Sequence, residues 1–427
     1  MTPKTHARRL GLRALTALTA LTALAFGALG AGCGAAGRSA ATPAAAAARD
    51  VRWVATWGTS PQLTEERNLP PAPGLSGNTL RQLVRVSVGG RRVRVRFSNA
   101  FGDGPLTIAG ARVAASDGEG RARPESDVAL SFGGQAATTI APGTAVVSDP
   151  IAYELAPLAD VAVTLHFGAV PKDVTGHPGS RTTSYLRSGD LTTADAMPAA
   201  VKVEHWYVLT GIDVVAERGE QAVVALGNSI TDGRGSTTNG NDRWTDNLAR
   251  RLRAEPRTAH VAVINAGIGG NAVLREGLGP PAVARFERDV LEQAGARWLI
   301  VLEGVNDIGG ARGAEGSARV AAELIAAYQQ LIARARGKGL RAYGATILPF
   351  GGSFYDSPEH EAARQTVNQW IRTSGAWDAV IDFDAAMRDP ARPARLRPDV
   401  DGGDHLHPNE AGYRVMADAV DLALFRR

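Results

Sequence analysis

Four short segments of the chain carry side chains whose types suit the cleavage of an ester bond. In chain order they are Gly227-Asn228-Ser229-Ile230-Thr231-Asp232-Gly233, Asn265-Ala266-Gly267-Ile268-Gly269-Gly270-Asn271, Gly304-Val305-Asn306-Asp307 and Asp404-His405-Leu406-His407-Pro408. A serine hydroxyl becomes an effective nucleophile when a base takes its proton, and the base works best when a carboxylate orients it. Ser229, His407 and Asp404 supply these three groups.

The same segments offer donors for the negative oxygen that develops during ester cleavage, which needs preorganised hydrogen bonds. The backbone N–H groups of Ser229 and Gly270 and the side-chain amide of Asn306 are expected to converge, because all three follow adjacent strands. Asp404 and His407 are three residues apart, so a single turn of chain can bring carboxylate and imidazole together.

A metal site is the alternative use of the last segment, because Asp404, His405 and His407 are all of types that bind metals. His260 precedes its expected strand and His360 lies in a helical stretch, so no further histidine is expected at the same end of the sheet. The sequence therefore favours a site without metal or cofactor, with His405 facing solvent or packing locally.

The elements that must position these segments begin after Gln221, where continuous apolar runs alternate with stretches of helical spacing. The expected strands are 222–226, 261–264, 298–302, 341–348 and 380–383, and the expected helices are 243–254, 282–294, 317–335, 359–371 and 408–425. Continuous apolar runs indicate strands buried on both faces. Five of them alternating with helices predict a doubly wound α/β fold with a parallel sheet, whose ligands bind at the carboxyl ends of the strands.

The region before it, residues 51–215, has the alternating pattern of antiparallel strands. Val84, Val86 and Val88 alternate with polar residues, a Gly-Gly pair follows, and alternation resumes up to Phe97, which predicts a hairpin. The same pattern returns at 161–167. Turn-rich stretches between the strands indicate a β-sandwich or jelly roll. The aromatic residues of this region are expected in its core rather than on a sugar-stacking platform; they are Trp53, Trp57, Trp206 and Tyr207.

The N-terminus has the pattern of an export signal over residues 1–32, in which a basic stretch ending at Arg13 precedes an uncharged run rich in Ala, Leu and Thr. The segment Leu29-Gly30-Ala31-Gly32-Cys33 resembles a lipobox, with Gly30 where Leu is usual. Cys33 is therefore either the lipid-anchored first residue of the mature protein or an incidental cysteine after a plain cleavable signal. Residues 33–50 are an Ala-rich linker. The prediction is a secreted or envelope-anchored protein without an internal disulfide.

The formal net charge gives no support to a nucleic-acid or acidic-membrane partner. The chain carries +4 overall, and four positive charges with no acidic residue lie before Cys33, so removal of that segment leaves no net charge.

Ser229, Gly270, Asn306 and His407 match, in order, the four blocks that name the SGNH/GDSL hydrolases, which the C-terminal half of the chain therefore resembles. The resemblance implies a flavodoxin-like catalytic domain over 220–427 and the following roles. Ser229 is the nucleophile, His407 the general base and then acid, and Asp404 its orienting partner; Ser229 N–H, Gly270 N–H and Asn306 form the oxyanion hole. The run 232–244 resembles the branch that carries an N-terminal β-domain, which often appears among polysaccharide-associated esterases.

One residue departs from the family pattern, because Asn228 stands where block I usually has Asp. Asparagine keeps the shape and one acceptor oxygen but loses the charge and gains a donor. The position of the nucleophile is unaffected, so we expect Asn228→Asp to keep activity.

The resulting functional hypothesis is a secreted serine esterase that forms an acyl-enzyme on Ser229 and acts on acyl or acetyl esters, with polysaccharide as a candidate substrate. Two alternatives remain, a polysaccharide O-acyltransferase with the same residues and a non-catalytic carbohydrate-binding surface protein. Glu303 and Asp307 flank the third segment; they either contact substrate or, as the default interpretation, form salt bridges or face solvent. Phe350, Phe354 and Tyr355 either line the pocket or pack within their loop; they follow the fourth strand.

Overall fold

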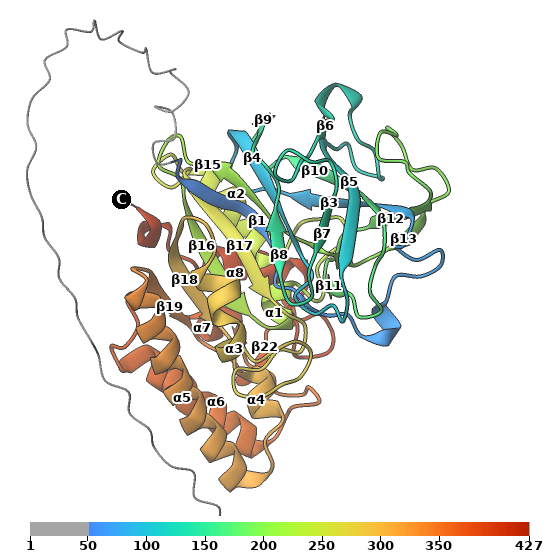
Figure 1. Ribbon diagram of the computed structural model, residues 1–427. Coiled ribbons are helices and arrows are strands. Elements are labelled where there is room, and N and C mark those ends of the chain that lie inside the picture. The colour runs from blue at the N-terminus through green and yellow to red at the C-terminus, as the bar shows by residue number, and fades with distance from the viewer. Residues whose placement is uncertain (1–50, 427) are drawn as a thin grey trace, which may run out of the picture. The chain divides into compact units, whose positions relative to one another are not determined.

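The C-terminal half of the chain is built around a parallel five-stranded sheet. The computed structural model describes residues 51–426. The strands are β16 (Gln221–Gly227), β17 (Val261–Gly267), β18 (Ala296–Leu302), β19 (Arg341–Ala345) and β20 (Ala379–Ile381), and they lie in the order β17-β16-β18-β19-β20 (Figure 1). This is the flavodoxin-like doubly wound order, with its switch point between β16 and β18. The predicted fold class is confirmed.

Helices cover both faces of this sheet, which explains why its strands are continuous apolar runs. On one face, Leu324 and Val367 share a hydrophobic core with Val224 and Leu299 of the sheet. On the other, Leu248 and Met416 pack with Val223 and Ile300. The first face is covered by α3 (Ala282–Phe286), which continues as a π-helix (Glu287–Leu291), α5 (Gly313–Gly337) and α6 (Pro358–Thr373), and the second by α2 (Trp244–Ala254) and α8 (Glu410–Asp418).

Several short elements were not predicted, and the last helix is shorter than expected. It ends at Asp418 and is followed by a 3-10 turn (Leu422–Phe425), so the predicted end near 425 was wrong. The unpredicted elements are α1 (Ser229–Asp232), α4 (Val305–Gly309), α7 (Phe383–Met387) and a small pair of strands, β21 (Arg388–Asp389) and β22 (Arg392–Leu396). Helices α1 and α4 begin directly after β16 and β18, where they present the first and third chemical segments.

The N-terminal part is rich in antiparallel strands, as predicted. One sheet contains β1 (Trp53–Gly58), β15 (Leu209–Val215), β4 (Gly90–Ser98), β8 (Ala145–Val147) and β9 (Ile151–Leu155). A second contains β13 (Val201–Val203), β12 (Ser184–Ser188), β3 (Asn78–Arg85), β10 (Asp160–Phe167), β5 (Leu106–Ala115), β6 (Val128–Ala129) and β7 (Thr138–Ile140). A third small sheet contains β14 (Trp206–Tyr207), β11 (Thr175–His177) and β2 (Gln62–Leu63), and two 3-10 turns lie at Glu66–Asn68 and Pro124–Ser126.

The predicted hairpin around the Gly-Gly pair is wrong, because the two strands enter different sheets. Strand β3 ends at Arg85 and pairs with β10 and β12, whereas β4 pairs with β15, β8 and β9. Alternation shows only that each strand has a buried face, and two strands facing one another across a sandwich satisfy it as well as two paired neighbours do.

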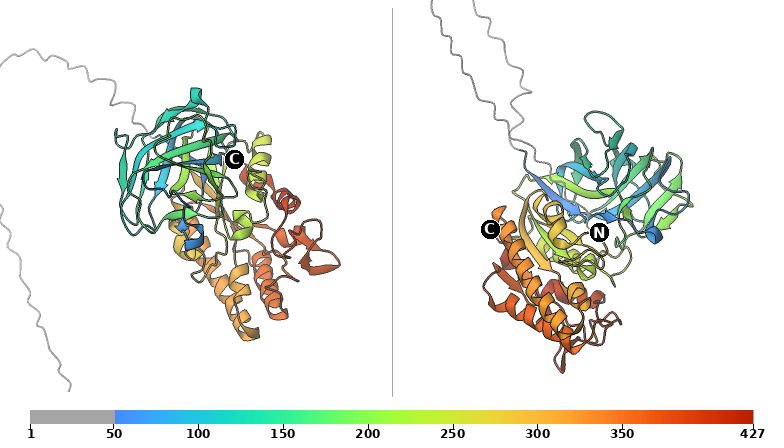
Figure 2. Two further views of the ribbon diagram at one scale, coloured as in Figure 1. Left: turned by 90° about the vertical axis from the view of Figure 1, so that its right-hand side faces the viewer. Right: turned by 60° about the horizontal axis from the view of Figure 1, so that its bottom comes forward.

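The antiparallel sheets of the N-terminal part and the parallel sheet of the C-terminal part lie side by side and share one hydrophobic core (Figures 1 and 2). Ala55 of β1 donates its N–H to Ala294 O (2.8 Å), and Val263 N donates to the Ser87 hydroxyl (3.1 Å). Residues from 51 to 426 accordingly belong to one compact unit. Among them, no helix has the length and apolar character needed to cross a bilayer. The predicted signal, Cys33 and linker lie outside the described residues.

Candidate active site

Three of the predicted site residues form a continuous hydrogen-bonded chain. The Ser229 hydroxyl lies 2.8 Å from Nε2 of His407, and Nδ1 of the same ring lies 2.7 Å from Oδ2 of Asp404. The other Asp404 oxygen accepts the backbone N–H groups of His407 (2.8 Å) and Leu406 (3.1 Å). The carboxylate therefore fixes both the ring and the turn that carries it, as expected from the spacing of three residues.

Burial sets the protonation of this chain. It lowers the pKa of His407 below 6.5 and outweighs the opposing effect of Asp404, so the ring is neutral at neutral pH and Nε2 can accept the serine proton. Partial burial opposes ionisation of Asp404, but hydrogen bonds from the backbone and ring of His407 outweigh it and lower its pKa. Asp404 is therefore ionised and can stabilise an imidazolium at position 407.

The three predicted oxyanion donors border the same cleft as the serine. The N–H groups of Ser229 and Gly270 make no hydrogen bond to any other of the residues 51–426. Gly270 has a φ of +72°, which favours glycine, and a Cβ there would lie 2.9 Å from Leu278. Asn306 donates one amide hydrogen to Asn271 O (2.6 Å) and accepts the Tyr355 hydroxyl at Oδ1 (3.0 Å). The amide is thereby held at both ends, with its second hydrogen left to donate.

The cleft around these groups has a volume of about 360 Å³, and its walls come from both parts of the chain. The N-terminal part supplies Gln62, Glu65, Arg67, Asn68, Pro178, Gly179, Arg181 and His205. The C-terminal part supplies the Phe354 and Tyr355 side chains in addition to the site residues. Sequence reasoning missed the N-terminal wall, because no spacing pattern connects residues 62–68 or 178–205 with Ser229.

The comparison with protein families agrees with this geometry. A family model described as the GDSL-like Lipase/Acylhydrolase family matches residues 225–415, a range that contains all five predicted site residues. Residues 225–415 form a GDSL-like lipase/acylhydrolase domain. The predicted resemblance is confirmed at the level of the family.

Solved structures that are similar to part of this chain have low sequence identity to it. An acetylxylan esterase from Geobacillus stearothermophilus is 21% identical, with 47% of this chain and 91% of that chain covered and a TM-score of 0.36. A GDSL-like lipase from Bacteroides thetaiotaomicron is 17% identical, with 48% and 87% covered and a TM-score of 0.35. A search of curated proteins found no match.

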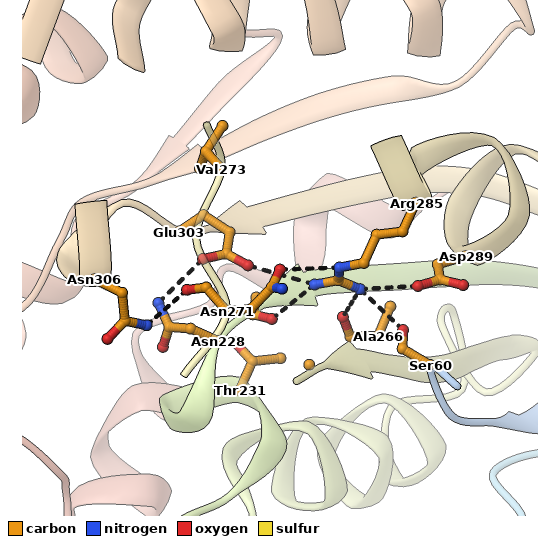
Figure 3. A network of polar contacts seen from close by, with 12 residues as sticks. Ser60, Asn228, Thr231, Ala266, Asn271, Val273, Arg285, Asp289, Glu303 and Asn306 are labelled. Carbon is orange, nitrogen blue, oxygen red and sulfur yellow. Dashed lines mark hydrogen bonds and ion pairs between the residues drawn. The ribbon is translucent and has the colours of Figure 1, made fainter. Parts of the chain in front are cut away.

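The structure gives a physical reason for the asparagine in block I of the GDSL-like domain. Asn228 Oδ1 accepts the N–H of Ile230 (3.1 Å) and caps α1, while Nδ2 donates to Glu303 Oε2 (3.3 Å; Figure 3). Glu303 is buried, and burial raises its pKa to about 8, with Arg285 opposing the shift. A neutral amide thus contacts a carboxyl group that burial keeps protonated at neutral pH.

A buried arginine beneath the site was not singled out from the sequence. Arg285 lies in α3, is 2% exposed and contacts the ends of three strands of the parallel sheet, or the segments that follow them, and the segment after β1 (Figure 3). Its partners are Gly227 O (3.0 Å), Ala266 O (2.7 Å), Asn271 Oδ1 (2.9 Å), Ser60 Oγ (2.9 Å), Asp289 (3.1 Å) and Glu303 (3.4 Å). A charged residue on the apolar face of the expected helix 282–294 was the available signal.

The other residues considered from the sequence contact neighbouring protein groups in the structure. Trp57, Trp206 and Tyr207 are buried and belong to the core, where the two tryptophans meet edge to face with ring centres 4.9 Å apart. Trp53 is only partly buried, with the Arg94 guanidinium 4.4 Å from its ring centre, so the expectation of a core position was wrong for this residue. Phe350 is buried away from the cleft.

Asp307 is buried and accepts the N–H groups of Val273 and Leu274, which lie in the segment after β17. His405 is half-exposed and pairs with Asp401. Within residues 51–426, no cluster of His, Cys, Asp and Glu is arranged to hold a metal ion.

Proposed function

We propose that the protein is a serine esterase that hydrolyses carboxylic esters through an acyl-enzyme on Ser229. The observation that carries this proposal is the chain of hydrogen bonds from Ser229 through His407 to Asp404, next to two N–H groups without a partner among residues 51–426. A nucleophile, an oriented base and oxyanion donors are the parts that acyl transfer needs.

The geometry supports the following sequence of steps. Ser229 Oγ attacks the acyl carbon while His407 Nε2 takes its proton, and the carbonyl oxygen becomes an oxyanion facing the Ser229 and Gly270 N–H groups and the Asn306 amide. The C–O bond to the alcohol then breaks, and His407 returns the proton to the departing oxygen. A water molecule attacks the acyl-enzyme with His407 again as base, and the carboxylic acid leaves as Ser229 regains its proton.

We extend the proposal to acetyl esters on polysaccharide and to a secreted or envelope-anchored location. Support for the first is the polar wall that the N-terminal part adds to an open cleft, which suits a substrate with many hydroxyl groups. Support for the second is the sequence of residues 1–33. The acyltransferase alternative forms the same acyl-enzyme and differs only in the acceptor, so product analysis with a sugar acceptor separates the two.

The test is hydrolysis of 4-nitrophenyl acetate, of esters with longer acyl chains and of acetylated xylan by the purified protein. Ser229→Ala should lower kcat by about four orders of magnitude or more, because its hydroxyl is the nucleophile. Ser374→Ala, at an exposed position of the same domain, should leave the rate unchanged. A serine-reactive fluorophosphonate should label Ser229. Full activity of the Ser229→Ala protein, or labelling at another residue, refutes the mechanism.

A further inference from the structure

The catalytic cleft has arginine side chains that no carboxylate neutralises. Arg67, Arg181 and Arg234 line the cleft, and none of them forms an ion pair within the part of the chain that the structure describes. The lining also contains two carboxylates, and neither forms an ion pair with these arginines. Glu65 accepts hydrogen bonds from the side chains of the nearby Gln62 and Asn68. Asp232 is buried, with Oδ1 2.8 Å from His177 Nε2 and Oδ2 without a hydrogen-bond partner among residues 51–426.

Arg181 is held in place from the C-terminal part of the chain. Its φ of +49° is uncommon for a residue with a side chain, and its carbonyl accepts the N–H of Asn239 (2.9 Å). The side chain of Asn239 in turn bonds Thr183 at both N (2.8 Å) and Oγ1 (3.0 Å). The Nε atom of Arg181 is buried and has no hydrogen-bond partner within residues 51–426. The backbone of Arg181 is thus held beside the cleft, and its guanidinium has a donor that no group among residues 51–426 uses.

Arg234 lines the same cleft and lies five residues after the nucleophile in the chain. Its N–H donates to Ser229 O (2.9 Å), and its carbonyl accepts the hydroxyl of Tyr413 (2.6 Å). The Arg234 side chain is exposed and lines the cleft together with His407. Arg181, Arg234 and His407 line the same cleft, and the charges of the two arginines add to burial in lowering the pKa of His407.

The alcohol portion of an ester must lie beside His407, because His407 gives its proton to the departing oxygen. We propose that Arg181 and Arg234 bind a carboxylate on the alcohol portion of the substrate, so that the preferred ester is an acetylated acidic sugar, such as a uronic acid. Guanidinium groups match the planar, two-oxygen geometry of a carboxylate. This inference rests on the proposed esterase function and names its substrate class.

The test compares two esters that differ only in whether one group is a carboxylate or a neutral carboxamide: the methyl glycoside of O-acetylated glucuronic acid and the corresponding O-acetylated glucuronamide. We expect the intact enzyme to show a kcat/KM about tenfold higher for the acid, the factor that one charge-assisted hydrogen bond supplies at a partly exposed site. Arg181→Gln and Arg234→Gln should each reduce this ratio, and the double variant should bring it close to one. The ratio cancels changes in His407 and in the amount of folded enzyme, because both affect the two esters equally.

Arg257→Gln is the matched control, because Arg257 is exposed and outside the cleft, and it should keep the full ratio. High salt should shrink the preference of the intact enzyme, since the side chain of Arg234 is exposed. Equal rates on the two esters, or an unchanged ratio in the double variant, overturn the inference while leaving the esterase function intact. Absence of hydrolysis of both of these esters and of 4-nitrophenyl acetate overturns the esterase function itself.

Discussion

The contact between Asn228 and Glu303 makes the effect of an aspartate at position 228 calculable. In Asn228→Asp, the new Oδ1 can still cap Ile230, because aspartate and asparagine are equally good helix caps. The other oxygen takes the place of Nδ2, 3.3 Å from Glu303 Oε2. A hydrogen bond survives between these atoms only if one of the two carboxyl groups is protonated, and Glu303 already holds a proton at neutral pH.

The size of the effect follows from this distance. Two negative charges 3.3 Å apart repel by about 5 kcal/mol at an effective dielectric constant of about 20. That energy corresponds to almost four pH units. Burial already raises the pKa of Glu303 to about 8, so in the variant this carboxyl stays protonated throughout the range in which the protein can be studied.

The sign of the pH dependence follows from proton counting. Between about pH 6 and 8, Glu303 is protonated in both folded proteins and ionised in both unfolded chains, so their stability difference stays constant. Above pH 8 the folded wild type releases this proton and the folded variant retains it. The variant should then lose stability relative to the wild type by about 1.4 kcal/mol per pH unit, or about 2 kcal/mol at pH 9.5.

Urea unfolding of both proteins at intervals from pH 6 to 9.5 measures this difference. Ester hydrolysis at pH 7 should persist in Asn228→Asp, because the hydrogen bonds around Ser229 are kept. The same substitution in a Glu303→Gln background provides the control, and there the stability difference should not widen above pH 8. A difference that is independent of pH in the wild-type background would show that Glu303 does not hold the shared proton.

Two further predictions concern the site directly. The kcat/KM for 4-nitrophenyl acetate should rise with pH to a plateau, with its midpoint below pH 6.5. The reason is that burial lowers the pKa of His407 and only the neutral ring is a base. A midpoint above pH 6.5 contradicts the assignment of His407 as the base. Tyr355→Phe should lower kcat by about tenfold with little change in KM, because the Asn306 amide loses the hydroxyl donor that orients it. An effect on KM alone would show instead that Tyr355 binds substrate.

Sequence patterns predicted the parallel sheet and the placement of the chemical segments well, because both depend on local properties. Buried strands such as β16 are continuous apolar runs, and the segments after them meet wherever parallel strands end at one edge. Ser229, Gly270 and Asn306 could therefore be placed at one edge from their positions after strands. The turn that joins Asp404 to His407 is local as well.

The features that were missed depend on contacts between distant parts of the chain. Strands β3 and β4 lie in different sheets because β3 pairs with β10 and β4 pairs with β15. The alternation of residues within a strand carries no information about which strand it pairs with. Arg285 gains its role from carbonyl groups that only the assembled sheet brings together. The arginine at 181 reaches the cleft because the N-terminal sheets pack on the GDSL-like domain, which no motif in either part records.

Ser60 and His177 belong to the N-terminal part and hydrogen-bond two buried residues of the C-terminal part, Arg285 and Asp232. A hydrolase half excised at residue 220, or recombined with an unrelated neighbour, would leave that guanidinium and that carboxylate each without one of its partners. The two halves are therefore expected to be inherited and expressed together, and truncation is a poor route to a minimal enzyme from this chain.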